Sequence, residues 1–129
     1  MNVLDENIVR AARERLQSWR VHFRRIGGEL GRRGMKDRNE IIPLLHGLHK
    51  PTFFTRDRDF CQSDLRHDGY CLVHLDVAYD EAALYIRRFL RNSSFRTQAQ
   101  RMGNVVRVHH NGLSYWRMGS EREHRIKWE

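Results

Sequence analysis

The segment PTFFTRDRDF, residues 51–60, is the part of the sequence that says most about the fold. After Pro51 it continues through Thr-Phe-Phe-Thr, four residues of high strand propensity, and then becomes abruptly polar. We therefore predict a strand over 52–55, with Asp57 and Asp59 placed just beyond its carboxyl end.

Working outward from this segment, other strands and helices alternate along the chain. Three further segments have the composition of strands, and they span residues 3–4, 21–26 and 70–75. Helical periodicity begins at Ile8 with Asn7 as N-cap, and begins again after Asp37, where Pro43 should kink the helix or displace its start. A strongly amphipathic helix covers 80–90, and 95–102 extends it after a break.

The end of the chain differs from what precedes it. Apolar residues on both sides of His110-Asn111-Gly112, a turn signal, predict an antiparallel hairpin. With 129 residues and no repeats, the chain is expected to form one domain, 1–129. Its core covers about 1–95, and the C-terminal helix and hairpin form an extension over 96–129.

Alternating strands and helices predict an α/β fold with a mostly parallel central sheet and helices on both faces. Right-handed crossovers give the order 2-1-3-4 for the first four strands. Strands 1 and 3 are then neighbours where the winding reverses, and ligands bind at such a point beyond the carboxyl ends of the strands. Asp5, Asp57 and Asp59 all follow these two strand ends, so we expect them to converge.

Converging carboxylates repel one another and raise each other's pKa unless a cation neutralises them. Oxygen ligands with open water positions suit Mg²⁺ or Mn²⁺. Glu40, in the first turn of the second helix, could reach the same crevice, and Asp37 is the alternative acid. The competing interpretation is that acids at strand ends cap helices, and that Asp57 and Asp59 pair with the arginines between them.

A metal ion in this crevice would polarise a scissile phosphate and activate water. Thr55 is expected to add a hydroxyl near the metal, and Asn7 is a second accessory candidate. Nearby arginines could grip the flanking phosphates; they are Arg24, Arg25, Arg32, Arg33, Arg56 and Arg58.

The charge of the chain also favours a polyanionic partner. Its 24 Lys and Arg against 16 Asp and Glu give a formal net charge of +8, which favours nucleic acid, although solubility and an acidic protein partner are alternatives. Arg107 and Arg117 on the hairpin are further candidate contacts for RNA. No apolar run approaches the ~20 residues of a membrane span, so we expect no membrane contact and a cytoplasmic location.

Three blocks of the sequence resemble the PIN-like family, in particular the short bacterial proteins of the Mut7-C and VapC-like type. They are Leu4–Ile8, Asp37–Ile42 and Phe54–Phe60, the last similar to the family's TRDxDF strand end. The resemblance implies a three-layer PIN fold and a Mg²⁺- or Mn²⁺-dependent endoribonuclease, often the toxin of a toxin–antitoxin pair. It also implies that Asp5, Glu40, Asp57 and Asp59 match the family's acidic quartet, with Asp37 as a substitute for Glu40.

Two other functions remain open at the level of sequence. The chain could be a non-catalytic module that binds nucleic acid or a partner, or a metal-dependent nuclease that acts on DNA. The expected partners are RNA, an antitoxin protein, and a second copy in a homodimer. Tyr115 or Trp116 is expected to pack either on the core or at a dimer interface.

Overall fold

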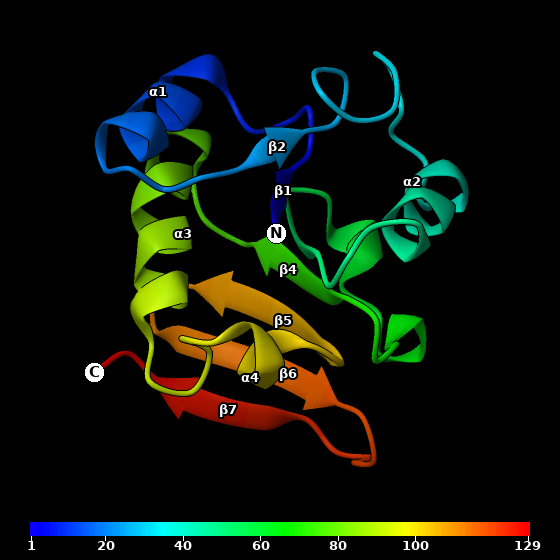
Figure 1. Cartoon of the computed structure of the whole chain (residues 1–129). Helices are drawn as coiled ribbons and strands as arrows, with labels where there is room; N and C mark the ends of the chain where they lie inside the picture. The colour runs from blue at the N-terminus through cyan, green and yellow to red at the C-terminus, as the bar shows by residue number, and fades with distance from the viewer.

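A seven-stranded sheet runs through the chain in the computed structural model, which describes residues 1–129 (Figure 1). The strands are β1 (Asn2–Leu4), β2 (Arg24–Arg25), β3 (Thr52–Thr55), β4 (Cys71–Leu75), β5 (Asn104–His109), β6 (Gly112–Arg117) and β7 (His124–Lys127). Their order is β2-β1-β3-β4-β5-β6-β7, so the predicted order of the first four strands is confirmed. The first five strands in this order are parallel, and β6 and β7 are antiparallel additions.

Four α-helices and three single 3₁₀ turns connect these strands. The α-helices are α1 (Arg10–Ser18), α2 (Arg38–His46), α3 (Ala82–Arg91) and α4 (Gln98–Arg101). The 3₁₀ turns are η1 (Arg58–Phe60), η2 (Ser63–Leu65) and η3 (Tyr79–Glu81). None of the helices combines the length and the apolar character needed to cross a bilayer. The element order and the strand pairing together confirm the predicted α/β class, the mostly parallel sheet and the C-terminal hairpin.

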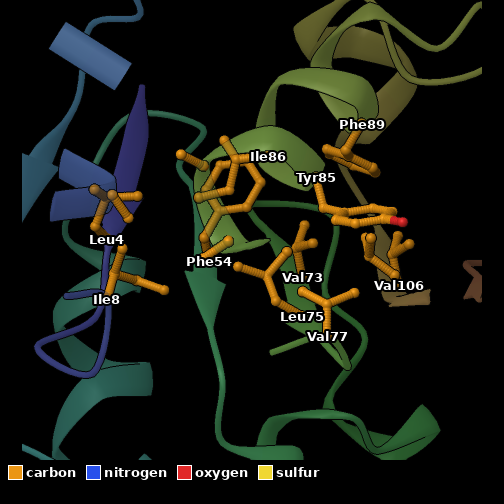
Figure 2. Packing of buried hydrophobic residues seen from close by; sticks show 14 of the residues in the cluster. Leu4, Ile8, Phe54, Val73, Leu75, Val77, Tyr85, Ile86, Phe89 and Val106 are labelled. Carbon is orange, nitrogen blue, oxygen red and sulfur yellow. The ribbon is translucent and has the colours of Figure 1, made fainter. Parts of the chain in front are cut away.

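Neighbouring residues of the central strands point to opposite faces of the sheet, and each face carries its own core. On one face Leu4, Phe54, Val73 and Val106 pack with α1 and α3 (Figure 2). On the other face, residues of the same strands pack with α2; they are Val3, Phe53, Leu72 and Val105, together with Ile41 and Leu45 of the helix. Figure 1 shows α1 and α3 together on one side and α2 on the other.

The predicted strand over 21–26 is wrong in length, because only Arg24 and Arg25 pair with β1. Val21 and Phe23 pack against the core beneath α1 and α3 instead of forming a ladder. Arg20, with φ of 60°, turns the chain out of α1 just before them.

The predicted N-cap at Asn7 is also wrong. The helix α1 begins at Arg10, and Val9 occupies the cap position without a side-chain hydrogen bond. Asn7 instead directs its side chain toward β3, where its carboxamide bridges Thr55 and Arg56.

The second predicted helix begins where its capping signal placed it. The carboxylate of Asp37 accepts a hydrogen bond from the Asn39 amide at 2.8 Å, and α2 continues through Pro43 to His46. The predicted 80–90 helix is present as η3 followed by α3, whereas only 98–101 of the predicted 95–102 extension is helical. The strand β7 had no counterpart in the sequence-based expectation.

Candidate functional site

Asp5 lies at the carboxyl end of β1, as predicted, and its side chain is buried at 5% exposure. Its amide donates to the Phe54 carbonyl at 2.9 Å, which continues the pairing of β1 with β3 by one residue. Its two carboxylate oxygens accept hydrogen bonds from the Thr55 hydroxyl at 2.6 Å and from the Glu6 amide at 2.7 Å. The carboxylate is therefore held rigidly inside the fold.

Thr55 is the centre of this hydrogen-bond network. Its hydroxyl donates to Asp5 and accepts from the Asp57 amide at 3.0 Å and from the Asn7 side-chain amide at 3.2 Å. The Asn7 carboxamide oxygen also accepts from the Arg56 amide at 3.1 Å. Both residues predicted as accessory, Thr55 and Asn7, thus orient the chain that carries Asp57.

The electrostatic environment of Asp5 opposes its ionisation. Burial raises the pKa of the Asp5 carboxyl above its usual value, and the nearby charges of Asp57 and Glu6 act in the same direction. The hydrogen bonds from Thr55 and the Glu6 amide act in the opposite direction and are outweighed. A cation beside Asp5 would reverse this balance by favouring the charged carboxylate.

Beyond the carboxyl end of β3 the chain forms an open hollow of about 480 Å³, here called the acid groove; the buried Asp5 is not among the residues that line it. Asp37 reaches it from the start of α2, whereas Asp57 and Asp59 reach it from the end of β3 and from η1. Asp57 caps η1 by accepting from the Asp59 amide at 2.9 Å. The remaining lining residues are Lys36, Arg38 and Gln62.

Glu40, the residue assigned by the resemblance, is not among the residues that line the acid groove. Its carboxylate forms an ion pair with Arg32, which lies in the loop before α2. The structure therefore brings Asp37 to the acids after β3 and leaves Glu40 in an ion pair. The difference arises because Asp37 occupies the N-cap, whereas Glu40 lies within the first turn of the helix.

The donor chemistry of these residues suits a hard divalent cation, because every side chain concerned offers carboxylate oxygens. Asp37 and Asp57 each use one oxygen to cap a helix or turn. The molecule contains six ion pairs, and none involves Asp5, Asp37, Asp57 or Asp59. In the present side-chain conformations, however, no three His, Cys, Asp or Glu side chains are grouped closely enough to hold a metal ion. Rotation of the exposed Asp37 and Asp59 would have to complete such a group.

The six arginines expected to grip phosphates lie in different places. Arg56 and Arg58 line a second hollow of about 660 Å³, here called the cationic hollow, which shares Asp59 and Gln62 with the acid groove. The other four lie elsewhere: Arg25 lines a separate hollow beside α1, Arg24 is exposed on β2, Arg32 pairs with Glu40, and Arg33 is exposed in the same loop.

Sequence reasoning missed two residues at this edge of the sheet. Asp76 directly follows β4, just as Asp5 follows β1, and this position was the signal that could have identified it. It accepts a hydrogen bond from Arg107 at 2.9 Å. Glu6 was missed because it looks like a solvated neighbour of Asp5, but it accepts from the Gly34 amide at 2.6 Å and fixes the loop before α2.

Comparison with known proteins adds no relative on which to base a function. The chain matches no protein-family model, no curated protein and no solved structure.

Proposed function

We propose that the chain is a PIN-like endoribonuclease that depends on Mg²⁺ or Mn²⁺ and acts as the toxin of a toxin–antitoxin pair. The three-layer PIN arrangement and the assignment to that family are part of this proposal. The observation that carries it is the environment of Asp5, a buried carboxylate at a strand end that forms no ion pair and whose pKa the nearby charge of Asp57 helps to raise.

Such an environment is unfavourable for the fold in the absence of a ligand. Burial of a carboxylate without a cation raises its pKa and disfavours the charged form. Perturbed carboxylates in a cleft are candidates for binding or catalysis, because functional sites are where such strain is retained. The net charge of +8 favours a phosphodiester chain as the occupant of the acid groove and the cationic hollow.

Each acid has a distinct part in the proposed reaction. Asp5 and Asp57 would hold the ion together with the acid at the start of α2, for which Asp37 is better placed than Glu40. A bound ion would polarise the scissile phosphate and lower the pKa of the attacking water. Asp59 lies on the boundary between the two hollows, where its carboxylate would orient that water or accept its proton.

The proposal is tested by cleavage of labelled single-stranded RNA and DNA in Mn²⁺, Mg²⁺ or EDTA. Asp5→Asn and Asp57→Asn should each reduce metal-dependent RNA cleavage by about 100-fold or more. Asp64→Asn is the matched control, because Asp64 is an exposed acid in η2 that does not line the acid groove.

The remaining outcomes assign other functions. Metal-dependent cleavage of DNA alone would make the protein a DNA nuclease. No cleavage of either substrate would leave a non-catalytic binding module. A comparison of Asp37→Asn with Glu40→Gln identifies the acid on α2. The toxin part of the proposal requires that expression of the wild type, but not of Asp57→Asn, arrests growth.

A further inference from the structure

We infer that the cationic hollow binds a second phosphate of the substrate RNA. The RNA would then cross the edge of the sheet from β3 towards β5. This inference rests on the proposed function, since it places the strand relative to the acids. It adds a binding site made of His74, Arg107 and Arg58, with Asp76 orienting Arg107.

The backbone register places these side chains in one row. Thr55 of β3 lies opposite His74 of β4, and His74 lies opposite Arg107 of β5. Side chains at paired positions of parallel strands point to the same face. Val73 and Leu75, on either side of His74, belong to the core under α1 and α3, so His74 projects to the opposite face. The row therefore leads from the Thr55 network beside Asp5 into the cationic hollow.

His74 is the best evidence that the hollow is built for a ligand. Its side chain lines the hollow, although the residue is only 8% exposed. Its Nδ1 atom is sealed from solvent without a hydrogen-bond partner, and the ring makes no other hydrogen bond within the protein. A buried polar atom without a partner costs stability. If the His74 ring rotates towards a bound phosphate, a phosphate oxygen would become the hydrogen-bond partner that Nδ1 lacks.

The arginines around His74 outnumber the carboxylates, which favours a bound anion. Arg56, Arg58 and Arg107 face the hollow, against the carboxylates of Asp59 and Asp76. Asp76 accepts from Arg107 Nε at 2.9 Å, and the other guanidinium nitrogens of Arg107 donate to no protein group. A guanidinium fixed at one edge in this way presents its remaining N–H groups to two oxygens of a phosphate.

The two hollows adjoin each other, because Asp59 and Gln62 line both of them. A strand whose scissile phosphate lies at the acids would place a neighbouring phosphate at His74 and Arg107. The occupant is thus a phosphodiester chain, whereas a free phosphate ion would need only the cationic hollow.

The experiment measures binding of a labelled single-stranded RNA in EDTA, where no cleavage occurs. A result in this assay is therefore independent of the nuclease activity. Arg107→Gln should weaken binding about tenfold. It should also reduce the slope of log affinity against log salt by about 0.7, the value for one lost phosphate contact on a single strand. Arg91→Gln on α3 is the matched control, because it removes the same charge from an exposed position on the opposite side of the sheet.

Two further variants separate binding from folding. Asp76→Asn keeps the charge of Arg107 but removes the carboxylate that orients it, so it should weaken binding less than Arg107→Gln does. His74→Phe should leave the melting temperature unchanged or raise it, since it removes an unpaired buried nitrogen, and should still weaken binding several-fold.

Equal effects of Arg107→Gln and Arg91→Gln would overturn the inference, and so would unchanged binding by His74→Phe. The remaining test is inorganic phosphate as a competitor. If the RNA binds no more tightly than inorganic phosphate alone, the hollow holds a free anion and not a strand. If Arg107→Gln binds RNA as tightly as the wild type and still cleaves it when Mg²⁺ or Mn²⁺ is added, the acid site is supported. Only the second phosphate site is then rejected.

Discussion

At the scale of single residues, Asp5 shows that a strand end can hold a carboxylate whose charged form is disfavoured by burial. The backbone pairing of β1 with β3 fixes where its side chain lies, and the hydroxyl of Thr55 holds it there. Solvent cannot compensate for the charge, because the side chain is buried. The fold thus tolerates a carboxyl group whose preference for the neutral form is raised above that of an exposed aspartate.

This preference has a definite dependence on pH. Because the folded-state pKa of Asp5 is raised above its unfolded value, the folded protein binds more protons, and its free energy of unfolding decreases as pH rises through that window. The contribution of this group is fully present below the unfolded pKa and fully lost above the folded one. We expect Asp5→Asn to lose this slope and to gain stability relative to the wild type as pH rises from 3 to 7.

The measurement is urea denaturation at each pH without added metal. Asp64→Asn, which removes an exposed acid, should keep the wild-type slope. A parallel pH dependence of the wild type and Asp5→Asn would show that Asp5 has an ordinary pKa. Added Mn²⁺ should raise the melting temperature of the wild type more than that of Asp5→Asn.

Residue-level prediction succeeded where the backbone decides the position of a side chain. The ends of β1 and β3 place Asp5 and Asp57 at the same edge of the sheet once the strand order is right, although Asp5 does not line the acid groove. It did not distinguish Asp37 from Glu40, because both begin the same helix and only the ion pair of Glu40 with Arg32 separates them. That pairing depends on the path of a loop that the local sequence does not specify.

At the scale of elements, α4 is a single turn that one buried arginine attaches to the sheet. Arg101 is 8% exposed, and its guanidinium donates to Thr52 Oγ1 at 3.0 Å and to the carbonyls of Phe95 and Arg96 at 3.0 and 3.1 Å. A helix of four residues has little stability of its own. The arginine therefore holds the segment that leads into β5.

We predict that Arg101→Gln reduces the free energy of unfolding by about 1–3 kcal/mol, because buried carbonyls and the Thr52 hydroxyl lose their donor. Equilibrium denaturation measures this loss. Arg96→Gln is the control, since the Arg96 side chain is exposed, and it should stay within about 0.5 kcal/mol of the wild type. Equal stability of the two variants would show that Arg101 does not anchor α4.

The elements that sequence patterns predicted best are those with strong apolar periodicity. The strand β3 and the helix α3 lie almost where they were expected, because β3 is buried throughout and α3 buries one whole face. The strand β7 escaped notice because His-Arg-Ile-Lys contains one apolar residue. It is a strand only because β6 provides a partner, which is a tertiary effect that local propensity does not contain.

At the scale of the whole molecule, Gly112 determines whether β7 can join the sheet. A Cβ atom at this position would lie 2.1 Å from the Ile126 carbonyl oxygen and 2.9 Å from Lys127 Cα. Both of these are backbone atoms of β7, so the strand would have to move.

Gly112→Ala should therefore displace β7 and lower the free energy of unfolding by about 1–3 kcal/mol. Hydrogen exchange should show faster exchange of the β6 and β7 amides. Gly47→Ala is the control, because its Cβ would meet only the Leu44 carbonyl oxygen at 3.4 Å, and it should have little effect. Unchanged exchange in Gly112→Ala would contradict this account of the β6–β7 contact.

Both outer strands of the sheet also limit how the molecule can associate with copies of itself. An open strand edge exposes unpaired amides and carbonyls that can template pairing with another chain. Here one edge is β2, only two residues long, and the other is β7, where exposed Arg125 and Lys127 alternate with His124 and Ile126. Short and positively charged edges oppose extension of the sheet from one molecule into the next. A homodimer of this protein should therefore form through helices or loops, and the monomer should resist fibrillar aggregation even at high concentration.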